Sequence, residues 1–113
     1  MIKLKDNPLE GTEIAMGGTT FIVPALNIKL AKQLKKETQL MADRSNPQAQ
    51  ETAMLKVILE AMKRNYPEIT AAEIEEIVDY KNIYQVIFAC IGQKVPENLG
   101  ELLPVMIGSG LMK

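Results

Sequence analysis

Three acidic side chains, Glu73, Glu76 and Asp79, are spaced three residues apart and could form a cation site. On a helix this spacing places them along one face, where carboxylate oxygens can bind a hard cation such as Ca²⁺. The alternative is a solvated acidic face, because acidic side chains are favourable near a helix N-terminus. We favour the solvated face, since the spaced ligands and central glycine of a calcium-binding loop are missing, and we expect no bound metal.

The other candidate for catalytic chemistry is the single cysteine, Cys90. The chain has no histidine, which excludes His-dependent catalytic triads and zinc sites built on imidazole. Cys90 falls on the apolar side of a predicted helix without a visible activating partner, so we interpret it as a core residue rather than a nucleophile. A single cysteine allows no disulfide within the chain and fits a reducing compartment. We therefore expect a protein that is not an enzyme and uses no cofactor.

Two patterns bear on phosphate binding, and both have simpler explanations. Gly17-Gly18 has neither the earlier glycine nor the Lys-Ser or Lys-Thr pair of a phosphate loop, and a two-residue hairpin turn explains it better. A basic helix face could contact nucleic acid; it consists of Lys29, Lys32, Lys35 and Lys36. No aromatic residue lies among these lysines, so we favour a solvated helix surface.

The composition fits one small domain. The chain has 113 residues, 47% of them hydrophobic, and a net charge of -1, which gives no general attraction to nucleic acid or anionic membranes. Its apolar runs are shorter than the roughly 20 residues of a membrane-spanning helix, and residues 1–6 lack an apolar signal region, so we expect a cytoplasmic protein. Seven methionines accompany only 4% aromatic residues. Methionine either fills the core or provides an adaptable apolar surface.

The predicted fold is mainly α, with about four helices and a small N-terminal β-hairpin. Apolar and β-branched runs on either side of Gly17-Gly18 predict the hairpin over residues 13–23, which Pro24 ends. Apolar periodicity predicts the helices over residues 28–43, 48–64 and 71–79 and from about 83 to 91. The second has the widest apolar arc and is expected at the centre.

Polar residues before each apolar pattern predict the helix starts. Asn27 and Asn46 are candidate N-caps, and Pro47 suits a first helical turn. Thr70 and Glu73 have the spacing of a capping box. Asn82 is expected to cap the last helix, which Gly92 ends; residues 1–92 then form one helical domain.

The segment 93–113 differs in character from the preceding domain. Proline and glycine recur in it, and no helix of useful length is predicted. Exposed apolar segments usually mark partner surfaces, so its apolar side chains are our candidate partner-binding residues. The alternative is that the segment folds back and completes the core. The candidate residues are Leu99, Leu102, Leu103, Met106, Ile107 and Leu111.

The order of these elements and one local motif resemble a known family. A hairpin with Gly-Gly and a closing Pro24 precedes a Leu-rich helix, and the next helix ends in Arg64-Asn65-Tyr66-Pro67 followed by Ile69-Thr70. An acidic helix and one beginning at Asn82 follow. In this order, residues 13 to about 92 resemble the tail assembly chaperones of long-tailed bacteriophages and prophages. The sharpest part of the resemblance is the Arg64–Thr70 stretch.

The resemblance implies a function without catalysis. Family members are small, mostly helical proteins that coat the tape-measure protein, help recruit the tail-tube protein and are absent from the finished virion. In several relatives a programmed frameshift adds a second C-terminal domain. The expected partners are therefore the tape-measure protein and the tail-tube protein in the bacterial host cytoplasm, and a homo-oligomer is compatible with the sequence.

Two alternative functions stay open at the sequence level. The first is a structural tail or head-to-tail connector protein, which would be found in purified virions. The second is a DNA-binding regulator that uses the helices on either side of Tyr66-Pro67 as a helix-turn-helix. We rank the regulator lower, because residues 71–79 would be its recognition helix and their acidic side chains would repel phosphates.

Overall fold

The N-terminal hairpin forms at the predicted place. In a computed structural model, which describes residues 2–92, strand β1 (Thr12–Met16) pairs antiparallel with strand β2 (Thr19–Val23). Gly17 and Gly18 connect them with φ angles of 57° and 82°. A two-residue turn of this kind needs positive φ at both positions, which glycine adopts without a steric penalty. Alternate side chains of the hairpin are buried: Ile14, Met16, Phe21 and Val23.

The next segment forms two short helices, so the prediction of one helix over residues 28–43 was wrong. Helix α1 (Ile28–Gln33) and helix α2 (Lys35–Met41) meet at Leu34, whose φ of -99° and ψ of 18° interrupt the helix. The Thr38 hydroxyl donates to the Leu34 carbonyl at 2.9 Å, and back-bonding of this type bends helices. Leu34 is buried, whereas neither helix itself contains a buried residue.

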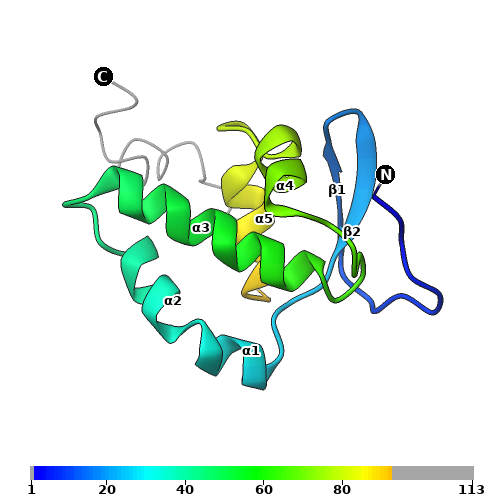
Figure 1. Cartoon of the computed structure of the whole chain (residues 1–113), viewed down its shortest axis with the longest axis horizontal. Coiled ribbons are helices and arrows are strands. Elements are labelled where there is room, and N and C mark those ends of the chain that lie inside the picture. Colours follow the sequence, from blue (N-terminus) through cyan, green and yellow to red (C-terminus); the bar gives the residue numbers. More distant parts are fainter. Residues whose placement is uncertain (1, 93–113) are drawn as a thin grey trace.

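Helix α3 (Pro47–Met62) lies at the centre of the helical body, as predicted. Figure 1 shows it between α2 on one side and α4 on the other, and it also packs against α5 and β2. The Asn46 side chain accepts from the Ala49 N–H at 3.1 Å, and Pro47 occupies the first turn. The predicted broad apolar face is buried, with Gln50 added: Gln50, Ala53, Met54, Val57, Ile58, Ala61 and Met62.

Helix α4 (Ala71–Ile77) begins with the predicted capping box. The Glu73 N–H donates to the Thr70 hydroxyl at 3.2 Å, and the Thr70 N–H donates to the Glu73 carboxylate at 2.9 Å. Glu73 is consequently half-buried rather than exposed. The helix ends two residues earlier than predicted, because Val78 adopts an extended backbone.

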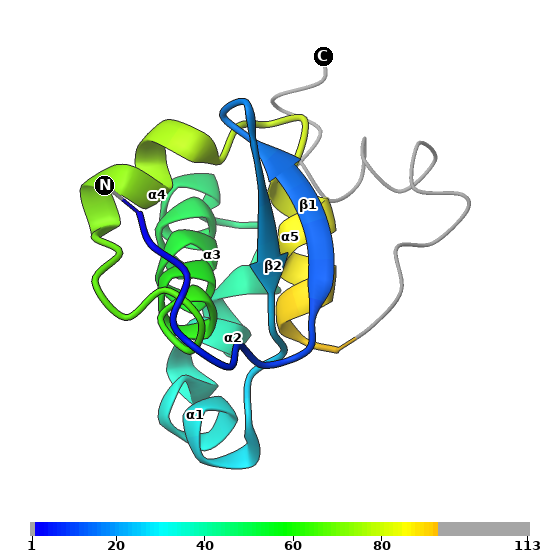
Figure 2. The same cartoon turned by 90° about the vertical axis from the view of Figure 1, so that its right-hand side faces the viewer.

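Helix α5 (Ile83–Cys90) packs against α3 and against both strands of the hairpin, which lie in front of it in Figure 2. The prediction that the Asn82 side chain caps this helix was wrong. The Asn82 side-chain oxygen accepts from the Asp79 N–H at 2.9 Å, and the side-chain NH₂ group donates to the Ile77 carbonyl at 3.1 Å. The side chain therefore closes the turn that precedes the helix. Gly92 ends the helix with a φ of 74°, as predicted. The described part of the chain thus contains five helical segments, since the first predicted helix is divided.

The buried Asn65 side chain joins three segments that are distant in sequence. Its amide donates to the carbonyls of Leu9 at 2.9 Å and of Ile22 at 3.3 Å, while its side-chain oxygen accepts from the Leu9 N–H at 2.7 Å. The Asn65 backbone carbonyl also accepts from the Lys5 N–H at 2.8 Å. The side chain has no exposed area, so these bonds replace water entirely. They attach the N-terminal segment and β2 to the end of α3.

The residues on either side of Asn65 strengthen the same attachment. The Tyr66 hydroxyl accepts from the Ile22 N–H at 2.8 Å, and its ring packs edge-to-face on Phe21 with centroids 5.4 Å apart. Aromatic pairs of this geometry contribute about 0.5–1.5 kcal/mol beyond their buried area. The Arg64 guanidinium donates to the Ala25 carbonyl just after β2. We call Arg64, Asn65 and Tyr66 the clasp.

Within residues 2–92 no helix has the length and apolar character needed to cross a membrane.

Replacement of Asn65 with Ala should lower the free energy of unfolding by about 3 kcal/mol, because it removes the partner of three part-buried backbone groups at Leu9 and Ile22. Chemical denaturation measures this loss. The matched control is Asn27→Ala, which removes one exposed cap bond to Leu30 and should cost about 1 kcal/mol. Equal losses in the two variants would show that Asn65 does not hold the segments together.

Replacement of Thr70 with Ala should cost about 1 kcal/mol, the usual loss for an N-cap hydroxyl. The reason is the loss of the bond from the Glu73 N–H. Thr52→Ala, at an exposed position inside α3, is the control and should change stability little. A denaturation midpoint that stays the same for Thr70→Ala would contradict the capping box.

Candidate partner-binding surface

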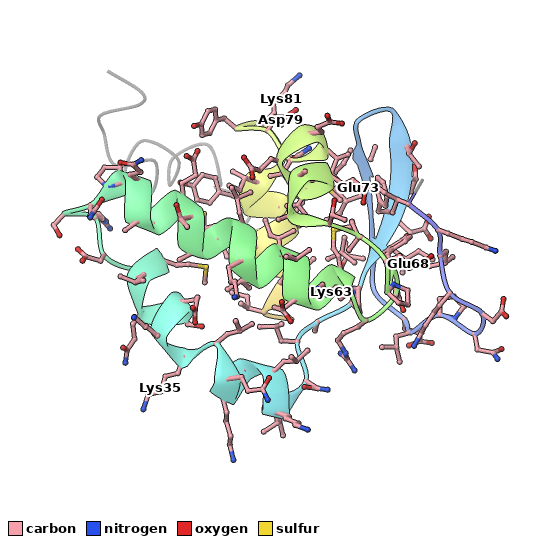
Figure 3. The ribbon with its side chains drawn as sticks, viewed as in Figure 1. Lys35, Lys63, Glu68, Glu73, Asp79 and Lys81 are labelled. Atoms are coloured by element: carbon pink, nitrogen blue, oxygen red, sulfur yellow. The ribbon has the colours of Figure 1, made fainter. Side chains whose placement is uncertain are left out.

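The three candidate cation ligands are not gathered into one site. Glu73 and Asp79 lie at opposite ends of the α4 segment (Figure 3). The Glu73 carboxylate is occupied by the capping box, and the Asp79 carboxylate accepts from the N–H groups of Lys81 at 2.9 Å and Asn82 at 2.8 Å. Both carboxylates therefore stabilise local backbone. In residues 2–92 no three His, Cys, Asp or Glu side chains are placed to hold a metal ion.

Cys90 lies in the core of the described domain. Its side chain has no exposed area, and burial raises the pKa of the Cys90 thiol from 9.0 to about 12. A thiolate is the reactive form of cysteine, and burial in apolar surroundings disfavours it. The position confirms the interpretation of Cys90 as a core residue.

The lysines of the predicted basic face are exposed on α1 and α2, as expected, and Lys35 points away from the body in Figure 3. The acidic helix α4 packs on another side of α3, so the basic face and the proposed recognition helix do not form one surface. Its Glu75 and Glu76 side chains are exposed. They would face the phosphates of a DNA duplex and repel them.

An apolar groove lies between α2, α3 and α5, and the sequence did not reveal it. Its volume is about 320 Å³, at the lower end of the roughly 300–1,000 Å³ of small-molecule pockets. Arg44 is the one charged residue among the described side chains that line the groove. The groove is lined by Thr38, Met41, Ala42, Arg44, Gln50, Met54, Tyr84, Ile87, Phe88 and Ile91.

A hydrogen bond between two lining residues connects two walls of this groove. The Gln50 side chain is buried and donates to the Met41 carbonyl at 2.7 Å, which connects the end of α2 to the start of α3. Tyr84 is also largely buried, and desolvation raises its pKa. Met41 and Met54 provide flexible, polarisable side chains on the two facing helices, a type of lining that adapts to different apolar surfaces.

A second groove shares Gln50, Met54 and Tyr84 with the first and has a volume of about 330 Å³. Its rim includes Tyr80, which is 59% exposed and whose hydroxyl donates to the Glu51 carboxylate. That contact raises the pKa of Tyr80. The second groove is therefore more polar at its edge, and the first is the stronger candidate for an apolar ligand.

The partner-binding residues predicted from the sequence lie outside the described residues 2–92. These are Leu99, Leu102, Leu103, Met106, Ile107 and Leu111. The groove was missed because its lining comes from three helices. The only local signal was the presence of Met41 and Met54 at the apolar edges of two predicted helices.

No family model, curated protein or solved structure matches this chain. The residues and geometry of the chain itself are therefore the basis of a functional proposal.

The Cys90 thiol should react very slowly with a thiol reagent in the folded protein, because the buried side chain has a raised pKa. At pH 7 and also at pH 9 the rate should stay far below that of the unfolded protein, because pH 9 still lies well below the raised pKa and very little thiolate forms. The measurement is the rate of colour development with an aromatic disulfide, with urea-unfolded protein as the control. Rapid stoichiometric labelling of the folded protein at pH 7 would contradict the core position.

Proposed function

We propose that this protein is a tail assembly chaperone of a long-tailed bacteriophage or prophage. It binds the tape-measure protein and aids assembly of the tail tube in the bacterial host cytoplasm, without catalysis. The observation that carries the proposal is the clasp. The Arg64–Thr70 stretch, which bears the resemblance to this family, attaches the hairpin to the helical body and starts α4.

The element order supports the same proposal. A hairpin with a Gly-Gly turn, a Leu-containing helical segment, a long central helix, an acidic helix and an apolar helix follow each other as the resemblance requires. The motif residues have defined structural roles in this arrangement. The fold therefore accounts for their spacing, which need not be a coincidence of sequence.

The apolar groove lined by Met41 and Met54 also suits a chaperone. A tape-measure protein is a long, largely helical chain with apolar side chains that would aggregate if they were exposed. Methionine-rich and leucine-rich surfaces bind such chains adaptably, and recognition of a helix by an apolar surface needs no charged specificity groups. Many copies along one chain give high avidity, while each individual contact stays weak enough for release during assembly.

Co-expression with the tape-measure protein of the same phage should keep that protein soluble, with several copies of this chain bound to it. The residues proposed to contact it include Leu102 and Leu103, whose side chains have no predicted helix to bury them. The double variant Leu102→Ser, Leu103→Ser should therefore lower the soluble fraction of the tape-measure protein. Pull-down and mass determination of the complex measure both effects.

The matched control is Ile28→Ser, which changes an apolar side chain that is 77% exposed at the start of α1. It should leave solubilisation as in the unmodified protein. If the unmodified protein leaves the tape-measure chain insoluble and unbound, the chaperone proposal fails. If the double variant solubilises as well as the unmodified protein, the chaperone proposal stands and the contact lies elsewhere.

A further inference from the structure

The groove between α2, α3 and α5 exposes apolar side chains that a stable protein normally covers. Ile91 is 40% exposed, and Met41 and Phe88 are only partly buried. Met41 ends α2, Phe88 lies in α5 and Ile91 directly follows α5, and all three line one cavity. Exposed apolar area that is gathered in one place usually marks a binding surface, whereas single exposed residues do not.

The chain itself leaves the described domain at the edge of this groove. Ile91 lines the groove, and Gly92, directly after it, ends α5 with positive φ. The Leu26 N–H donates to the Cys90 carbonyl at 2.8 Å, so the end of α5 is fixed against the segment that follows β2. Residues 93–113 therefore start beside the groove.

Reach and tethering both favour this segment as the occupant. Leu102 is ten residues beyond Gly92, so an extended connection of about 35 Å is available at roughly 3.3–3.6 Å per residue. A short tether raises the effective concentration of the segment at the groove to about the millimolar range. A separate partner or a second copy would have to compete with that concentration.

The chemistry of the segment complements the lining. Its leucines and methionines are separated by Pro96, Gly100 and Pro104, which discourage a helix that would bury them against its own surface. They need an apolar surface supplied by another part of the fold. Its two acidic residues, Glu97 and Glu101, stand on either side of Leu99, and the charged side chain of the groove lining is the cation of Arg44.

We propose that residues 93–113 fold back in the free protein and place the Leu102–Leu103 region in the groove lined by Met41, Phe88 and Ile91. The docking is intramolecular and does not depend on the proposed function. If the chaperone function also holds, the apolar contact residues are sheltered in the free chain and become available when the tape-measure protein displaces them from the groove.

A tryptophan placed in the segment tests this directly, because the chain contains none. In Leu103→Trp the indole should be buried, so its fluorescence emission should be shifted to shorter wavelength than in the matched variant Lys113→Trp. Adding Ile91→Glu to Leu103→Trp introduces a negative charge at the rim and should return the emission to the value for exposed tryptophan. Adding Ile28→Glu, the same change at an exposed position that does not line the groove, should leave the blue shift intact.

Three results would overturn the proposal. Equal emission from Leu103→Trp and Lys113→Trp in the intact protein would show that the segment is not docked. A blue shift that survives Ile91→Glu, with the far-UV circular dichroism unchanged, would place the segment elsewhere. A blue shift that disappears on dilution would show binding to a second copy. Since all of these measurements use the protein alone, failure here leaves the tape-measure experiment unaffected.

Discussion

The side-chain amide of Asn65 is the interaction on which the arrangement of this fold depends. A buried amide without partners costs about 1–3 kcal/mol for each unmet bond, so its position is tolerated only where every partner is in place. Leu9 and Ile22 provide those partners from the N-terminal segment and from β2. An isolated two-stranded hairpin is marginally stable in water. The hairpin is therefore stable because the end of α3 supplies both the hydrogen bonds of the clasp and an apolar face that the hairpin covers.

Local sequence signals were sufficient for most of the helical architecture. Gly17-Gly18, Asn46-Pro47 and the Thr70–Glu73 box each determine their structure within a few residues, through positive φ or a cap. The broad apolar arc of α3 also predicted its central position, because a helix touched on several sides needs apolar residues on several sides.

The features that the sequence did not reveal depend on distant contacts. The helix is interrupted at Leu34, whose side chain is buried against the rest of the domain. No local sequence pattern indicated this interruption. Asn82 stands at a helix start, but its side chain satisfies groups at Ile77 and Asp79 instead. The roles of Asn65 and of the groove lining require knowledge of which segments meet. For the same reason the candidate residues beyond Gly92 could be named from the sequence but not assigned a surface.

The distribution of burial distinguishes the parts of the described domain that hold its shape from those that are held less firmly. The hairpin, α3 and α5 hold most of the buried core, whereas α1 and α2 contain no buried residue; α2 packs on α3 through partly buried side chains such as Met41 and through the Gln50–Met41 hydrogen bond. Elements with few buried contacts open at lower free energy than the core does. We therefore expect the α2 wall of the groove to open more readily than the α3 and α5 walls. Met41 of α2 and Met54 of α3 both line the groove, and their flexible side chains can adapt to a small movement of α2.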